Sequence, residues 1–181
     1  NGGIGIFEVD DEHGWTQEYI NKLYKIVNSV MVEDVFYGID KDYNMADDKP
    51  TPQSITDDFT SKMNEVKNNG LTLLCLDYCS SPSHVTDSFA KCQPLGYVDY
   101  CSSTRQLNAI ETYAVPYENA DNHYSVKDIK NYMVLLNSEK FPGVDALINA
   151  LAKTNYDCII MDISDSNGML SPEQISKIRY K

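Results

Sequence analysis

Three acidic residues stand at the ends of apolar runs, where carboxylates could do chemistry. Glu33 ends the run VMVE, Asp77 ends LLCLD, and Asp162 ends CIIMD. Burying an ionised carboxylate without a partner is costly, so an acid in such a place needs a physical reason. Two carboxylates beside a bound sugar can cleave a glycosidic bond, one as acid and the other as nucleophile or base. The alternative is that each acid caps the following helix or pairs with a nearby Lys or Arg.

The elements that would position these acids alternate between apolar runs and helical patterns. In the segment after Thr51, apolar residues recur at helical spacing, and Gly70 provides a stop. Ser171, Pro172 and Gln174 form a helix start, with a cap, a proline at the first helical position and a capping-box partner. The expected strands are 29–38, 71–79, 96–103, 131–137 and 156–164, and the expected helices are 54–70, 83–93, 141–154 and 170–181.

Strands that alternate with helices predict parallel strands joined by helical crossovers, which is an α/β architecture. The carboxyl ends of such strands open into one shared cleft, so we expect Glu33, Asp77 and Asp162 to converge there. One domain is expected over residues 1–181. The irregular stretch 110–125 is either a long connection or a seam.

Composition excludes several classes of partner and cofactor. The formal net charge of −12 argues against nucleic acid, because phosphates require clustered Lys and Arg. No apolar run reaches the roughly 20 residues that span a bilayer. The five cysteines form no C-x-x-C pair, so we expect no metal site, and buried thiols are favoured over one disulfide or a nucleophile. No glycine-rich phosphate loop occurs, and no cofactor is expected.

Several stretches resemble one protein family. VMVEDVFYG, NNGLTLLCLDYCSS and GYVDY look like the later strands of proteins related to glycoside hydrolase family 114, the endo-α-1,4-polygalactosaminidases. Many relatives of that family are labelled cysteinyl-tRNA-synthetase-related proteins. NYMVLLN, NYDCIIMDIS and LSPEQISKI resemble its first two strands and the helix that follows them.

The resemblance implies a (β/α)8 TIM barrel, which would be partial or permuted because the two halves occur here in inverted order. It also implies a catalytic role for Glu33 as general acid/base. Asp77, Tyr78 and Asp162 would contact substrate, and Asp34 would lie beside them.

One part of that family's pattern is missing from this chain. The glycine-rich strand that carries the second catalytic aspartate is not recognisable, and only GIGIFEVD could be its degenerate form. This interpretation nominates Asp10 or Glu8 as the second acid.

The expected function is hydrolysis of an amino-sugar polysaccharide, with an oligosaccharide or polysaccharide as partner and an extracellular or periplasmic location. The alternative is a carbohydrate-binding or assembly module that does not cleave sugar. The substrate, the linkage and the oligomeric state do not follow from the sequence.

Overall fold

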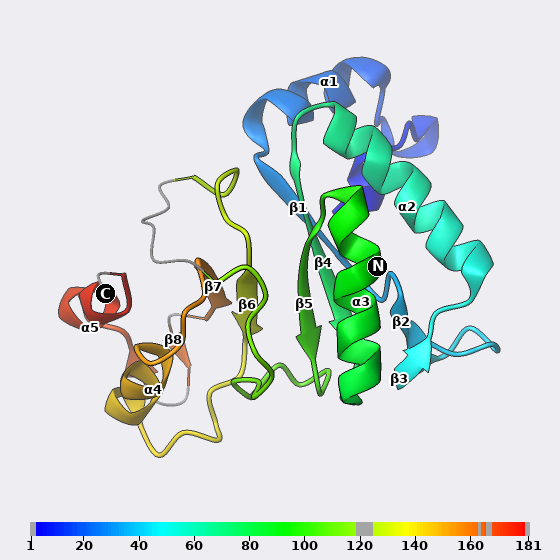
Figure 1. Ribbon diagram of the computed structural model, residues 1–181. Helices are drawn as coiled ribbons and strands as arrows, with labels where there is room; N and C mark the ends of the chain where they lie inside the picture. Colours follow the sequence, from blue (N-terminus) through cyan, green and yellow to red (C-terminus); the bar gives the residue numbers. More distant parts are fainter. Residues whose placement is uncertain (1–2, 119–124, 163, 166–167, 180–181) are drawn as a thin grey trace.

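The computed structural model describes residues 3–118, 125–162, 164–165 and 168–179 (Figure 1). The helices are α1 (Gln17–Ile26), α2 (Gln53–Asn68), α3 (Pro82–Leu95), α4 (Val144–Leu151) and α5 (Pro172–Arg179), preceded by the 3-10 turns η1 (Gly3–Phe7) and η2 (Asp11–His13). The strands are β1 (Ser29–Glu33), β2 (Tyr37–Ile39), β3 (Met45–Pro50), β4 (Thr72–Tyr78), β5 (Val98–Ser102), β6 (Tyr132–Leu135), β7 (Cys158–Met161), β8 (Ser164–Asp165) and β9 (Gly168–Met169).

The N-terminal part is built on a parallel sheet with the strand order β1-β4-β5. Side chains alternate across this sheet, so each strand contributes to two cores. Leu73 and Cys75 of β4 pack in one core with Met63 of α2 and Cys92 of α3. Tyr78, on the other face of β4, packs in the second core.

The C-terminal part packs against that second face. Its strands β6 and β7 form a parallel pair with α4 between them in the chain, and α5 follows β7 and the short strands β8 and β9 (Figure 1). Tyr132 of β6 connects the two parts, because its hydroxyl donates a hydrogen bond of 2.8 Å to the carbonyl of Cys75. Its ring also contacts the ring of Tyr100, with 5.8 Å between centroids. Leu147 and Leu151 of α4 complete this shared core.

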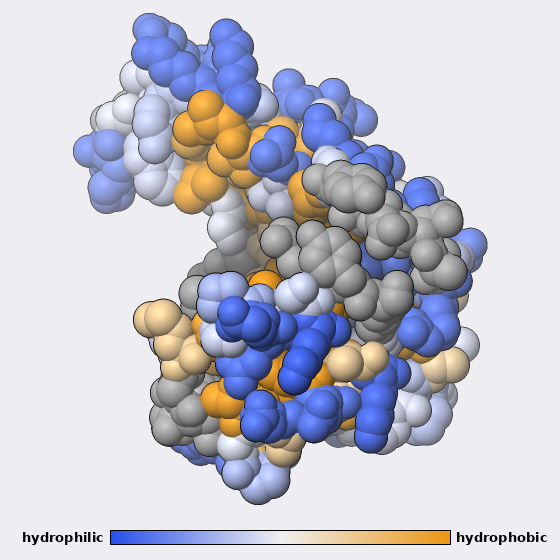
Figure 2. Space-filling model, turned by 90° about the vertical axis from the view of Figure 1, so that its left-hand side faces the viewer, coloured by the Kyte–Doolittle hydropathy of each residue, from blue (hydrophilic) through white to orange (hydrophobic). Residues whose placement is uncertain are grey.

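The expected (β/α)8 TIM barrel is wrong. A barrel closes only when every strand pairs at both edges, and among the described residues no ladder joins β5 to β6 or β7 to β1. The stretch 3–10, expected as a degenerate barrel strand, instead contains the 3-10 turn Gly3–Phe7. Viewed from the side of α4 and α5, the molecule is hollowed, and apolar side chains gather at the upper border of the hollow (Figure 2). Because these ladders are missing from the described residues, the parallel strands form two separate open sheets, β1-β4-β5 and β6-β7.

Most expected elements are present, although their bounds differ. The capping box of α5 is confirmed: the Gln174 side chain accepts a 2.8 Å hydrogen bond from the Ser171 amide, and Ser171 Oγ accepts one of 3.3 Å from the Gln174 amide. The acidic segment after Gly38 lies between the expected strand 29–38 and the expected helix 54–70, where no element was expected, and it forms most of the antiparallel β2–β3 hairpin. Residues 110–118 contain no helix or strand, and 119–124 of the expected connection lie outside the described residues.

Within the described ranges, no helix combines the length and the apolar character needed to cross a bilayer.

Candidate functional site

Glu33 and Tyr78 meet at the carboxyl edge of the three-stranded sheet. Glu33 ends β1 and Tyr78 ends the neighbouring β4. The Tyr78 hydroxyl donates a hydrogen bond of 2.9 Å to Oε2 of Glu33. Burial and the adjacent carboxylate raise the pKa of Tyr78, so its hydroxyl remains a donor at neutral pH. Glu33 is partly exposed, and no described residue donates a hydrogen bond to its Oε1. That oxygen is available to a ligand.

Asp34, the next residue, is held in a different way. It adopts a left-handed backbone conformation with φ of 62°, and its side chain is only 7% exposed. Arg105 donates to both carboxylate oxygens of Asp34, over 2.6 and 3.2 Å. Burial raises the pKa of Asp34, and the guanidinium of Arg105 counteracts part of that rise. Asp34 therefore serves as a structural partner of Arg105.

Arg105 organises the surroundings of this pair. Its Nε lies 2.7 Å from Asp47 of the β2–β3 hairpin, and its guanidinium stacks on the Tyr78 ring at 4.1 Å from the centroid. The guanidinium also donates to the Gly38 carbonyl. A Cβ at Gly38 would lie 1.8 Å from Asp34 Oδ1, so only glycine allows this close approach. Arg105 thus forms ion pairs with two acids, and among the described residues no ion pair joins it to Glu33.

Asp77 does not face Glu33. Successive residues of a strand point to opposite faces, so Asp77 lies beneath α3 while Tyr78 lies on the Glu33 side. Oδ1 of Asp77 accepts a hydrogen bond of 3.0 Å from the amide of Phe36. The hydroxyl of Ser88 lies 2.7 Å from Asp77 Oδ2 and 2.7 Å from Asp99 Oδ2. One hydroxyl hydrogen cannot serve both carboxylates, so one of the two acids carries a proton, and burial raises the pKa of both.

Asp162 and Asp10 also lie apart from Glu33. Asp162 follows β7 in the second sheet, is exposed, and accepts a hydrogen bond of 3.0 Å from the Ser164 amide. Asp10 accepts one of 3.2 Å from the His13 amide and lies 2.8 Å from the His13 ring, whose hydrogen bond lowers the pKa of Asp10. Of the expected site residues, Glu33, Asp34 and Tyr78 come together, and no described contact links Asp77, Asp162 or Asp10 to Glu33.

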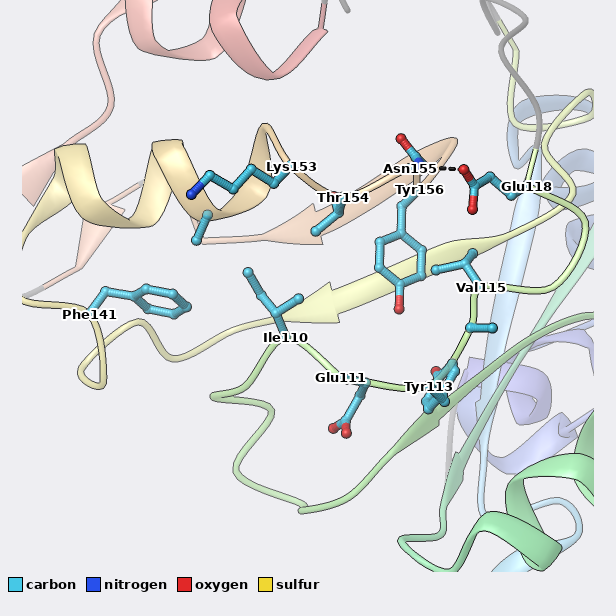
Figure 3. Close-up of a pocket in the computed structure, with 12 residues that line it drawn as sticks. Ile110, Glu111, Tyr113, Val115, Glu118, Phe141, Lys153, Thr154, Asn155 and Tyr156 are labelled. Atoms are coloured by element: carbon cyan, nitrogen blue, oxygen red, sulfur yellow. Dashed lines mark hydrogen bonds between the residues drawn. The ribbon is translucent and has the colours of Figure 1, made fainter.

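A pocket of about 630 Å³ lies elsewhere, between the stretch 110–118 and the end of α4 (Figure 3). Tyr113, Phe141 and Tyr156 contribute aromatic rings, and Asn155 contributes an amide at the rim. The Tyr113 hydroxyl is fixed by the backbone of Cys101, to whose carbonyl it donates over 2.9 Å. The expected site residues do not line this pocket.

Sequence reasoning missed Arg105 as a site residue. Arg105 is separated from Asp34 by 71 positions and lies in a loop without a motif. A usable signal existed, because Arg105 is the only Lys or Arg between Lys91 and Lys127 and comes three residues after β5 ends at Ser102. A lone cation at an acidic strand edge predicts an ion pair there.

Comparison of the chain with protein-family models, with curated proteins and with solved structures found no match.

Proposed function

We propose that this protein binds oligosaccharides that carry amino groups, that Glu33 contacts the sugar ammonium, and that the sugar is not cleaved. The observation that carries the proposal is the partly exposed carboxylate of Glu33 at the sheet edge, whose Oε2 accepts a hydrogen bond from Tyr78 and whose Oε1 accepts none from the described residues. The resemblance of VMVEDVFYG and NNGLTLLCLDYCSS to amino-sugar hydrolases supports the same ligand class.

The neighbours of Glu33 favour binding over hydrolysis. Glycosidases use two carboxyl groups, about 5 to 10 Å apart, on the two sides of the scissile bond. Asp34 is buried in its pair with Arg105, and Asp77 lies on the opposite face of the sheet. Neither Asp34 nor Asp77 is therefore available to act with Glu33, and Asp47, the other acid described at this edge, is paired with Arg105.

The charge distribution favours a cationic ligand. Two acids, Asp34 and Asp47, surround the single positive charge of Arg105. Together with Glu33 they give this edge of the sheet a net negative charge. The chain as a whole has a formal net charge of −12, which attracts cations over distance. An ammonium on the ligand would form a charge-assisted hydrogen bond with Glu33 Oε1.

The β2–β3 hairpin extends this edge. Its strands contact Arg105 through Gly38 and Asp47. Tyr43, in the turn of the hairpin, is 69% exposed and offers an aromatic face. Aromatic rings of this kind stack on the apolar faces of sugars.

The pocket beside Tyr156 is a competing place for a sugar, because it is concave and lined by aromatic rings (Figure 3). Its lining carries two acids, Glu111 and Glu118, and one base, Lys153. Both acids already accept hydrogen bonds, Glu111 from Ser103 and Glu118 from Asn155. A Tyr156→Ala variant separates the two places. Under our proposal this variant keeps its affinity for amino sugars.

The proposal is tested by titrating the protein with α-1,4-linked galactosamine oligomers and with their N-acetylated forms. We expect binding of the free amine, weaker binding of the N-acetylated form, and no release of reducing ends after prolonged incubation. Equal affinity for both forms would exclude an ammonium contact. Release of reducing ends by the wild type, and its loss in Glu33→Gln, would show that the protein is a hydrolase.

A further inference from the structure

A row of sulfur and oxygen donors is buried between the three-stranded sheet and α3. Cys75 of β4 and Asp99 of β5 are opposite each other in the strand register, and Cys92 and Ser88 reach them from α3. All four are buried, with exposed fractions of 0% for Cys75, 6% for Asp99, 1% for Cys92 and 0% for Ser88. An apolar contact would be the ordinary filling for such an interface.

Three of these donors converge on one point. The Sγ atoms of Cys75 and Cys92 and a carboxylate oxygen of Asp99 all lie within 4.8 Å of one another. In a tetrahedral zinc site with Zn–S bonds of about 2.3 Å, neighbouring ligand atoms are roughly 3.7 Å apart. Small rotamer adjustments would bring the three atoms to that spacing.

A second observation concerns the carboxylate of the same cluster. Oδ1 of Asp99 is buried and has no hydrogen-bond partner among the described residues. A buried acceptor without a partner destabilises the fold, and a bound cation would satisfy it. The other oxygen of Asp99 is already paired with the Ser88 hydroxyl over 2.7 Å, which orients the carboxylate.

We propose that Cys75, Cys92 and Asp99 bind a structural Zn²⁺ ion that fastens α3 to β4 and β5. Two thiolates favour zinc over the harder cations magnesium and calcium. Binding would release the protons of both thiols and of the Asp99 carboxyl if it holds one. The fourth ligand position has two neighbouring donors, Ser88 Oγ and Cys101 Sγ, the latter 3.9 Å from Asp99 Oδ2.

The site lies on the opposite face of the sheet from Glu33, so it is independent of the proposed sugar binding. Its role is to hold the helix in place. The spacing of the ligands, Cys75-x16-Cys92-x6-Asp99, matches no short zinc motif, because the ligands come from two strands and the helix between them. This is why the cysteine spacing alone predicted no metal site.

The test uses the full chain, refolded under reducing conditions with one equivalent of Zn²⁺ or of Co²⁺ and then dialysed. We expect about one zinc per chain by elemental analysis and a higher unfolding temperature than that of the metal-free protein. With Co²⁺ we expect thiolate-to-metal charge-transfer absorption. Cys92→Ser and the nearly isosteric Asp99→Asn should each reduce retained metal at least tenfold, whereas Cys158→Ser, in the other sheet, should retain it.

Circular dichroism of the metal-free variants shows whether they fold, and Asp99→Asn preserves the volume of the site if Cys92→Ser does not fold. The proposal is overturned if the wild type retains no zinc after refolding. It is also overturned if the cobalt complex lacks thiolate absorption, or if Cys92→Ser and Asp99→Asn retain as much metal as Cys158→Ser.

Discussion

Glu33 and Asp34 are neighbours in the chain with different surroundings. Glu33 ends a strand on the same face as Tyr78 and remains partly exposed. Asp34 turns the chain with a positive φ and is buried against Arg105. A bidentate pair of this kind fixes both side chains. It also holds the guanidinium of Arg105 in place over the ring of Tyr78. The geometry of Glu33 therefore depends on the pair between Asp34 and Arg105.

Removing the arginine of this pair should be costly. Arg105→Ala leaves Asp34 buried without its cation, and we expect a loss of about 3 kcal/mol in the free energy of unfolding, measured by urea denaturation. The matched control is Lys22→Ala, which removes the exposed pair Lys22–Glu18 and should cost less than about 0.5 kcal/mol.

A double variant tests the cause of that loss. If the unpaired charge is responsible, Asp34→Asn combined with Arg105→Ala should be less destabilised than the sum of the two single variants. Strict additivity would show that Asp34 and Arg105 do not interact.

At the scale of elements, the start of α3 is held by an acid from the β2–β3 hairpin. Asp48 accepts hydrogen bonds of 3.0 and 2.9 Å from the amides of Ser80 and Ser81, and its Oδ1 lies 3.0 Å from the His84 ring. Burial alone would raise the pKa of Asp48, but the hydrogen bonds from Ser81, His84 and Ser80 outweigh it and hold the pKa well below its ordinary value. This carboxylate fastens the hairpin to the helix.

The pH dependence of stability follows from the direction of that shift. A folded-state pKa below the unfolded value means that the stabilisation is present above the unfolded pKa of about 4 and is lost as pH falls through the folded pKa. Asp48→Asn keeps the left-handed backbone, with φ of 60°, because asparagine tolerates it.

We expect Asp48→Asn to lower the unfolding free energy by about 1 kcal/mol at pH 7. The difference from wild type should shrink as pH falls below about 4, because the unfolded chain then takes up a proton at Asp48, whereas the folded protein, in which the pKa of this carboxyl is held lower, does not yet do so. Calorimetry at pH 7, 4 and 3 measures this difference in unfolding free energy. The control is the variant Asp128→Asn, which changes an exposed aspartate. A difference that does not change with pH would contradict the role of the charge.

Strands and helices were largely predictable because their apolar periodicity is local, as in the LTLLCLDYC run that forms β4. A position near the end of a strand does not predict the face of the sheet to which the side chain points. Glu33 and Asp77 both stand near strand ends, but one residue of offset sends Asp77 to the helix side. Whether the sheets close into a barrel depends on strand pairing between distant segments, which leaves no local sequence pattern. The Asp34–Arg105 pair depends on the conformation of a loop, which also leaves none.

At the scale of the whole molecule, the two open sheets share one core. Leu74 and Leu76 of β4 pack in the same cluster as Tyr132 of β6 and Leu151 of α4. The Tyr132 hydroxyl also bonds the carbonyl of Cys75. Such a shared core predicts that the two parts unfold together.

Truncating a core side chain in the C-terminal part should therefore also destabilise the N-terminal part. Leu151→Ala should cost about 2–5 kcal/mol and shift the urea midpoint of Trp15 fluorescence as far as the midpoint seen by circular dichroism. Leu136→Ala, where the side chain is 49% exposed, is the matched control and should shift neither. If the Trp15 midpoint stays in place while the circular-dichroism midpoint moves, the parts unfold independently.

In the proposed function, Glu33 is the anion that binds the amino group of the sugar. The most direct measurement is the affinity of Glu33→Gln for galactosamine oligomers, compared with wild type and with Glu139→Gln, an exposed glutamate in the second half of the chain. Loss of one charge-assisted hydrogen bond should weaken binding roughly 10- to 100-fold in Glu33→Gln, and Glu139→Gln should bind like wild type. Equal affinity in all three proteins would contradict the proposed site.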